Sequence, residues 1–207
     1  MRIALLGATG GIGGHVLGWA LESGHTVQAL ARTPEALHPA PGLTVVQGNA
    51  LDADSVTEVV DGAQAVVSAL GPRGAKAPGL LAGAAANTVV AMAKTAAQRL
   101  VCVSAAGAFI STDSNMAWLI KSVLPRVLAT QFADVRRMED VVRASGLDWT
   151  LVRASRLTNK PLMGHYRVAP DYPPPGGGKI TRADVAHFIA HALTDGTWLH
   201  ASPALAY

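Results

Sequence analysis

The sequence predicts an α/β fold, in which a mostly parallel sheet is covered by helices on both faces. Three observations favour it. Short apolar runs alternate with segments of helical spacing through the first half of the chain, which is typical of βαβ units. The 207 residues are 50% hydrophobic but only 5% aromatic, so the core must be built from Ala, Val, Leu and Ile. The 21 glycines suit small-residue helices on parallel strands better than an all-β sandwich.

Glycine, proline and aspartate mark the element boundaries in the first half. Gly24 follows the first helical pattern, where glycine commonly ends a helix. Pro34 suits the first position of a helix after Thr33, and Asp52 or Asp54 can cap the helix after that. In chain order we expect a strand at 2–6, a helix at 10–22, a strand at 26–31, a short helix opened by Thr33, a strand at 43–46, a helix that ends at 60, a strand at 65–70, a helix at 80–97 and a strand at 100–104.

The second half of the chain is less regular. We expect a helix at 131–144, a sixth strand at 148–153 and a last helix at 183–193. Thr181, with Asp184 three residues later, indicates a capping box at the start of that helix. The Pro- and Gly-rich stretch before it, which includes 170–178, is expected to be a lid or a surface loop. Without a repeat or a linker, residues 1–207 should form one domain with a small C-terminal substrate region.

Composition and charge argue against several classes of protein. Cys102 is the only cysteine, which excludes a disulfide framework and a Cys-based zinc site. The formal net charge is +3 without a dense Lys/Arg run, so no nucleic-acid partner is expected. No apolar stretch reaches about 18 residues, so no membrane span is expected.

Three further expectations concern metal, assembly and location. His187 and His191 share a helical face but lack further ligands, so no metal site is predicted. Nothing indicates an obligatory dimer, and we expect a monomer or a weak homodimer. A strand begins where a signal peptide would lie, so we expect a cytoplasmic protein.

The most informative motif is the glycine turn, Gly-Ala-Thr-Gly-Gly-Ile-Gly at residues 7–13, between the first strand and the first helix. Gly7 permits a tight turn, Gly10 lets a pyrophosphate approach the backbone, and Gly13 lets the helix sit close to the sheet. The N–H groups of the turn and the helix dipole then hold the phosphates. The motif predicts a dinucleotide site on a doubly wound, Rossmann-type sheet, with Thr9, Gly11 and Ile12 in the same turn.

The end of the second strand indicates which dinucleotide binds. An acidic residue about 20 positions past the glycines would bind the ribose of NAD. Here the strand ends at Arg32, and the first acidic residue after it is Glu35. A guanidinium at this place pairs with a 2′-phosphate. NADP(H) is therefore favoured over NAD(H), and the alternative is a solvated surface arginine.

Six longer segments together resemble one family. They are GATGGIGG at 7–14, ALART at 29–33, VVQGNALDADSV at 45–56, AVVSALGPRG at 65–74, RRMEDVVRASGLDWTLVRASRLTNKPLMGHYRV at 136–168 and ITRADVAHFI at 180–189. On these motifs the chain resembles the atypical short-chain dehydrogenase/reductase group, which contains the NmrA-like proteins and the flavin reductases of the biliverdin-IXβ reductase type. The resemblance covers nearly the whole chain.

The resemblance implies further residues around the cofactor. Asn49 and Ala50 would contact the adenine; the family usually has Asp where this chain has Asn49, whose amide can still pair with a base. Residues on the route to the nicotinamide ribose would be Ala69, Leu70, Gly71 and Arg73. Ser104 and Ala154 lie at the carboxyl ends of the fifth and sixth strands, where cofactor and substrate meet.

The type of catalysis is indicated by a catalytic pair that the sequence lacks. None of the three tyrosines, Tyr166, Tyr172 and Tyr207, has Lys four residues on, so the Tyr–Lys pair of ordinary short-chain dehydrogenases is missing. A nucleotide-sugar or small-carbonyl enzyme is disfavoured for this reason. The flavin reductases also lack that pair, and the resemblance implies an NADPH-dependent reductase of a small planar, conjugated acceptor such as a flavin, a tetrapyrrole or a quinone.

Two residues are the candidates for catalysis. Ser104 is expected to hydrogen-bond the nicotinamide or the substrate, or else its own local backbone. Arg156 is expected to bind an anionic substrate group, or else to be a surface arginine. The alternative function is an NmrA-like redox sensor, which binds NADP(H) without turnover and acts through a protein partner.

Overall fold

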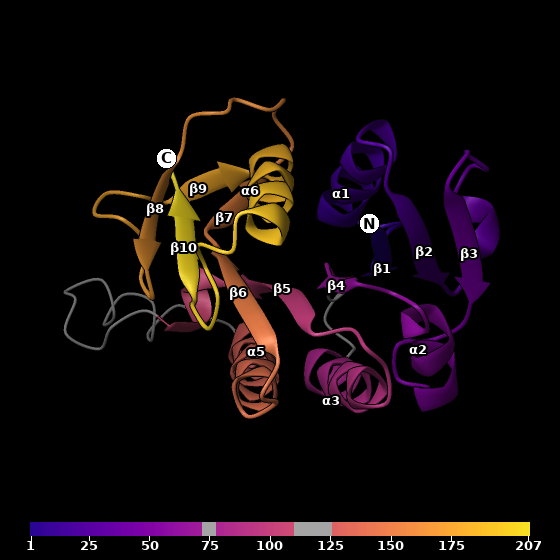
Figure 1. The fold of residues 1–207 in the computed structure, drawn as a ribbon. Helices are drawn as coiled ribbons and strands as arrows, with labels where there is room; N and C mark the ends of the chain where they lie inside the picture. The colour runs from indigo at the N-terminus through magenta and orange to yellow at the C-terminus, as the bar shows by residue number, and fades with distance from the viewer. Residues whose placement is uncertain (72–77, 110–125) are drawn as a thin grey trace.

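An eight-stranded sheet forms the centre of the computed structural model, which describes residues 1–71, 78–109 and 126–207 (Figure 1). Its strand order is β3-β2-β1-β4-β5-β6-β10-β8, and every neighbouring pair is parallel except β10 and β8. The strands are β1 (Arg2–Leu6), β2 (Thr26–Ala31), β3 (Leu43–Gln47), β4 (Ala65–Ser68), β5 (Arg99–Ala105), β6 (Asp148–Ala154), β8 (Arg167–Pro170) and β10 (Pro203–Ala206). A separate parallel pair joins β7 (Arg156–Thr158) to β9 (Lys179–Thr181).

Helices cover both faces of the sheet (Figure 1). One face carries α1 (Gly11–Glu22) and α6 (Arg182–Thr194); the other carries α2 (Ala53–Val60), α3 (Leu80–Ala93) and α5 (Arg126–Arg143). Within β1, Ile3 and Leu5 pack on the first face, and Ala4 and Leu6 pack on the second. Because both faces are buried at the centre of the sheet, β1 and β4 are mostly apolar. The predicted doubly wound α/β fold is confirmed.

Two predicted helix starts are confirmed by their capping bonds. The Asp52 carboxylate accepts a hydrogen bond from the Ser55 N–H, with 3.1 Å between Oδ2 and N, and so caps α2. Thr181 Oγ1 accepts one from the Asp184 N–H at 3.0 Å, and so caps α6. These caps are local in sequence, which is why the sequence predicted them.

Two other predicted helices are shorter than expected. Pro34 begins only a three-residue 3₁₀ turn, Pro34–Ala36, and the Thr33 side chain makes no capping bond. The backbone becomes extended at Leu37, so no second helical turn forms. The helix predicted to reach residue 97 ends at Ala93, because the N–H groups of Lys94 and Thr95 bond carbonyls three residues back and tighten the last turn.

The Pro- and Gly-rich stretch is more ordered than a surface loop. It contains β8, the stretches beside it contain β7 and β9, and the last residues form β10. β10 lies between β6 and β8, parallel to the first and antiparallel to the second, and all four of its residues are buried. The predicted loop is confirmed at 171–178, which form no helix or strand. The short strands were missed, because strands of three or four residues are specified by distant partners rather than by their own pattern.

The sheet topology indicates where a ligand would bind. Strand order reverses between β1 and β4, so the connections after these two strands diverge to opposite faces at their carboxyl ends. Ligands of open α/β sheets bind in the crevice at such a point. Within the described residues, no helix is both long and apolar enough to cross a membrane.

Candidate dinucleotide site

Two glycines of the turn after β1 leave no room for a side chain. Gly7 has φ +89°, and a Cβ added there would lie 2.6 Å from the carbonyl oxygen of Ala69. A Cβ at Gly13 would lie 2.1 Å from the carbonyl oxygen of Gly7. The turn is closed by a hydrogen bond from the Gly10 N–H to the Gly7 oxygen, 2.9 Å long between N and O. Residues 7–13 therefore form a tight cradle at the start of α1, with no side chain at Gly7, Gly10, Gly11 or Gly13.

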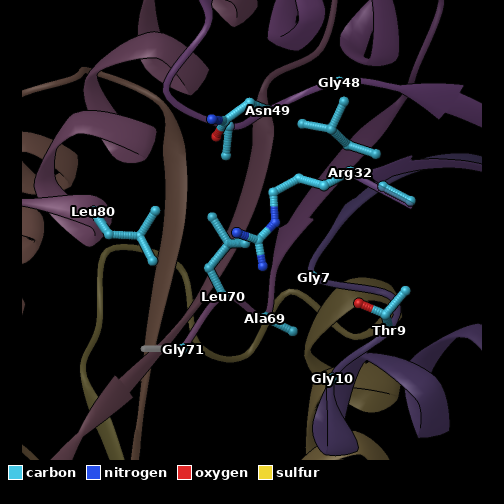
Figure 2. Close-up of a pocket in the computed structure, with 13 residues that line it drawn as sticks. Gly7, Thr9, Gly10, Arg32, Gly48, Asn49, Ala69, Leu70, Gly71 and Leu80 are labelled. Carbon is cyan, nitrogen blue, oxygen red and sulfur yellow. The ribbon is translucent and has the colours of Figure 1, made fainter. Parts of the chain in front are cut away.

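Two pockets open on this cradle and share Thr9, Gly10 and the segment Ala69–Gly71. We name the first the Arg32 pocket (Figure 2). Its lining residues are Gly7, Thr9, Gly10, Leu30, Ala31, Arg32, Gly48, Asn49, Ala50, Ala69, Leu70, Gly71 and Leu80. We name the second the Ser104 pocket. Its lining residues are Thr9, Gly10, Gly11, Ile12, Ala69, Leu70, Gly71, Leu81, Val103, Ser104, Ala105, Val135, Leu157 and Arg182.

Arg32 is the one charged side chain among the described residues of the first pocket. Figure 2 shows it reaching from the end of β2 across the pocket towards Leu70, between Asn49 and the glycine turn. The side chain is exposed, and no carboxylate in the described parts of the chain forms an ion pair with it. An unpaired guanidinium in this place is available to an anion.

The loop after β3, with Gly48, Asn49 and Ala50, forms one wall of the Arg32 pocket. Asn49 Oδ1 accepts a hydrogen bond from the Leu51 N–H, 3.1 Å from the nitrogen. Asn87 Nδ2 donates to the Ala50 carbonyl oxygen at 3.1 Å. The first bond holds the Asn49 side chain by its oxygen, which leaves its amide NH₂ to donate to a ligand.

The Ser104 pocket is mostly apolar and has a volume of about 430 Å³, a size typical of small-molecule sites. Its walls include Leu70, Leu81, Val135 and Leu157. Ser104 and Arg182 add polar groups at its edge. This combination suits a flat apolar ring with one or two oriented polar groups.

Ser104 is held by a buried ion pair. Its hydroxyl donates to Glu139 Oε1, with 2.6 Å between the oxygens. Arg153 donates to both oxygens of the same carboxylate, from Nε at 3.0 Å and from Nη2 at 2.7 Å. Glu139 and Arg153 are only 1% and 5% exposed. The hydroxyl proton is therefore committed to Glu139, and the Ser104 oxygen can only accept a hydrogen bond from a ligand.

Arg153 and Cys102 support the structure around Ser104, and neither lines the Ser104 pocket. The Arg153 guanidinium carbon stands 3.6 Å from the centroid of the Phe109 ring, a cation–π contact that holds the ion pair in place. Burial, together with the nearby Glu139 charge, raises the pKa of the Cys102 thiol to about 12. Cys102 is therefore a core residue and not a nucleophile.

The structure brings together most of the residues that the sequence predicted. Gly7, Thr9, Gly10, Gly11, Ile12, Arg32, Asn49, Ala50, Ala69, Leu70, Gly71 and Ser104 all line one or both pockets. Gly13 lies behind the turn and packs against it. Ala154 is buried in β6, and Arg156 is exposed at the start of β7; neither lines the Arg32 pocket or the Ser104 pocket. Arg73 lies outside the described residues.

Arg182 is the main residue that the sequence analysis missed. It is the first residue of α6 and lines the Ser104 pocket beside the glycine turn. The capping box around Thr181 predicted where the helix begins. No pattern in the neighbouring sequence predicts that the first residue of this helix contacts Gly11. The apolar walls from α3, α5 and β7 were missed for the same reason.

Comparisons with known proteins agree with this geometry. A family model described as NAD(P)H-binding matches residues 7–196. The uncharacterized sugar epimerase YhfK of Bacillus subtilis is 27% identical over 203 residues, which are 94% of this chain and 89% of that protein.

Solved structures show the same fold. A short-chain dehydrogenase/reductase from Veillonella parvula in complex with NADP has a TM-score of 0.83 and 21% identity, over 100% of this chain and 94% of that one. A candidate NADH-flavin reductase from Streptococcus pneumoniae has a TM-score of 0.82 and 21% identity, over 100% and 99% of the two chains.

Proposed function

Because the chain belongs to the NAD(P)H-binding family, we propose that it is an NADPH-dependent reductase of the flavin reductase type. It transfers hydride to a planar conjugated acceptor, such as a flavin, a tetrapyrrole or a quinone. One observation carries this proposal: a phosphate-binding turn is flanked by a pocket with a free arginine and by a mainly apolar pocket. The first suits the adenosine half of the dinucleotide, and the second suits a nicotinamide ring with an acceptor against it.

Arg32 supports NADPH over NADH. Its guanidinium reaches into the adenosine side of the site and has no carboxylate partner among the described residues. A 2′-phosphate would supply that partner, whereas the ribose diol of NADH would not. The glycine turn fits the rest of the dinucleotide. A Cβ at Gly7 or Gly13 would collide with backbone atoms, so the absence of side chains there keeps the turn tight, and the N–H groups at the start of α1 can hold phosphates.

The reaction needs little from the protein beyond placement. Reduced nicotinamide supplies a hydride, the acceptor gains it together with a proton from solvent, and NADP⁺ remains. The apolar side chains of the Ser104 pocket orient two flat rings and exclude water. Ser104 accepts a hydrogen bond from a donor on the nicotinamide or the acceptor, because its own proton is held by Glu139.

The sites also fit the redox-sensor alternative, and one observation favours it. Among the described residues that line the Ser104 pocket there is no Tyr, Lys, His or carboxylate, so no side chain in that set can serve as a general acid. Tyr166 is hydrogen-bonded to His187 elsewhere, and burial and the Asp184 charge raise its pKa to about 12. The same lack disfavours sugar epimerisation, which needs proton transfer.

The test is the rate of NADPH oxidation with FMN as acceptor, with NADH measured beside it. We expect turnover with NADPH and little with NADH. Arg32→Ala should raise the Kd for NADPH by about 10- to 100-fold, the worth of a charge-assisted contact, and should leave the Kd for NADH nearly unchanged.

Three other results are informative. Equal losses for the two dinucleotides would contradict the role of Arg32. Tight NADPH binding without reduction of FMN, a quinone or a linear tetrapyrrole would support the sensor instead. No dinucleotide binding at all would refute the proposed function.

A further inference from the structure

Arg182 lies against the glycine turn, although the two are far apart in sequence. A Cβ added to Gly11 would stand 2.5 Å from Arg182 Cδ and 2.9 Å from Arg182 Nε. Gly11 is not among the glycines with positive φ, so its backbone does not require glycine. The space that a side chain would take at residue 11 is occupied by the stem of Arg182.

The charge of Arg182 has an unfavourable setting as long as no anion is present. Arg182 is the first residue of α6, and Gly11 is the first residue of α1. The two helices pack side by side on one face of the sheet (Figure 1). The guanidinium is therefore close to the positive ends of two helix dipoles, where a cation is disfavoured and an anion is stabilised.

No acidic side chain among the described residues compensates this charge. The guanidinium instead donates a hydrogen bond to a neutral group, from Nη1 to Asn159 Oδ1 at 2.5 Å. No carboxylate in the described ranges forms an ion pair with it. The described lining of both pockets contains two charged side chains, Arg32 and Arg182, and no acid. The cleft is therefore complementary to an anion at each of two places.

We propose that Arg182 binds the diphosphate of the dinucleotide and closes the phosphate site from α6. The inference rests on the dinucleotide binding of the proposed function. Asn159 holds one nitrogen of the guanidinium beside Gly11, so the remaining donors are left for the diphosphate. The diphosphate is common to NADP(H) and NAD(H). Arg182 thus adds affinity for both dinucleotides, whereas Arg32 favours NADP(H) over NAD(H).

The experiment compares binding of four ligands to the full chain: NADP⁺, NAD⁺, ADP and 2′-AMP. Arg182→Met keeps an unbranched stem over Gly11 and removes the charge. We expect the Kd values of NADP⁺, NAD⁺ and ADP to rise by a similar factor, about 10- to 100-fold. The Kd of 2′-AMP, which has no diphosphate, should stay unchanged. Arg32→Ala should show the opposite pattern, with losses for NADP⁺ and 2′-AMP alone.

A pair of glycine substitutions gives a matched control. Gly11→Ala forces the Arg182 stem to move and should weaken NADP⁺ and NAD⁺ together. A Cβ at Gly14 meets only the Ala8 oxygen at 3.7 Å, so Gly14→Ala should leave both Kd values unchanged. The thermal unfolding midpoint of each variant shows that any loss of binding does not come from unfolding.

An Arg182→Met variant that binds both dinucleotides as well as the parent does would overturn the inference. If that variant also has a raised KM for FMN and not for an uncharged quinone, Arg182 is assigned to the acceptor. A parent protein that binds no dinucleotide would instead refute the proposed function, and the inference with it.

Discussion

Gly13 and Gly14 are neighbours in the first turns of α1, but a methyl group would meet very different surroundings at each. At Gly13 it would lie 2.1 Å from the backbone oxygen of Gly7, and at Gly14 its nearest atom is 3.7 Å away. Gly13→Ala should therefore destabilise the protein by about 3 kcal/mol and abolish NADP⁺ binding. Gly14→Ala should stabilise it by up to about 1 kcal/mol, because alanine favours the helix. Urea unfolding and NADP⁺ titration measure both effects, and equal behaviour of the two variants would contradict this packing.

The position of Ser104 could be predicted from the sequence, but its hydrogen-bond partner could not. Its place at the end of β5 could be predicted, because the apolar run before it is a local pattern. Its hydrogen bond to Glu139 could not, since the partner is in α5 and its charge is balanced by Arg153 in β6. The sequence suggested a ligand or the local backbone as partner, and the structure shows a buried carboxylate.

At the scale of elements, Asp184 joins three segments that are separate in the chain. Its buried carboxylate accepts hydrogen bonds from Thr181 Oγ1 at 2.6 Å, from the N–H groups of Gly164 and Met163 at 2.8 and 3.2 Å, and from the Tyr207 hydroxyl. Burial alone would raise the pKa of Asp184, but these hydrogen bonds outweigh it and lower the pKa below its ordinary value of 3.8. The carboxylate thus ties the loop before β8 and the residue after β10 to the start of α6.

Asp184→Asn should cost about 2 kcal/mol of stability at neutral pH, because bonds to a charged acceptor are replaced by weaker ones. Since the folded-state pKa is the lower one, this stabilisation is present above pH 3.8 and declines as the pH falls through the folded-state value. The difference between parent and variant should shrink over that range in urea unfolding curves. Asp140→Asn, at an exposed position in α5, is the control. An Asp184→Asn protein as stable as its parent at neutral pH would contradict the assigned role.

The accuracy of the sequence prediction differs between elements for a physical reason. β2 was predicted with its observed ends, and the caps of α2 and α6 were predicted correctly, because each depends on residues within a few positions. The short strands β7 to β10 were missed because their stability comes from partners far along the chain. The same holds for the contact of Arg182 with Gly11.

At the scale of the whole molecule, β10 connects the regular part of the sheet to its antiparallel edge. All its residues are buried, and it pairs with β6 on one side and with β8 on the other. Deletion of residues 203–207 removes both pairings and the Tyr207 bond to Asp184. We expect loss of the cooperative unfolding transition and of NADP⁺ binding, although the glycine turn follows β1 and three strands lie between β1 and β10.

Circular dichroism during thermal unfolding, followed by an NADP⁺ titration, checks this prediction. Tyr207→Phe removes one hydroxyl and keeps the strand, so it should lose only a fraction of the stability. If the truncated chain unfolds at the midpoint of the parent, then β10 is not needed to complete the sheet.

The late position of β10 in the sequence also sets an order of events at the ribosome. Synthesis proceeds at about 5–20 residues per second, and β1 to β5, with the glycine turn and Arg32, are made well before α6 and β10. The nascent chain therefore carries one half of its ligand site for several seconds while the edge of β6 has no neighbour. An unpaired strand edge invites pairing with other chains. Cells that make this protein in quantity should depend on chaperones during that interval, and slowing of translation just before residue 203 should lengthen it.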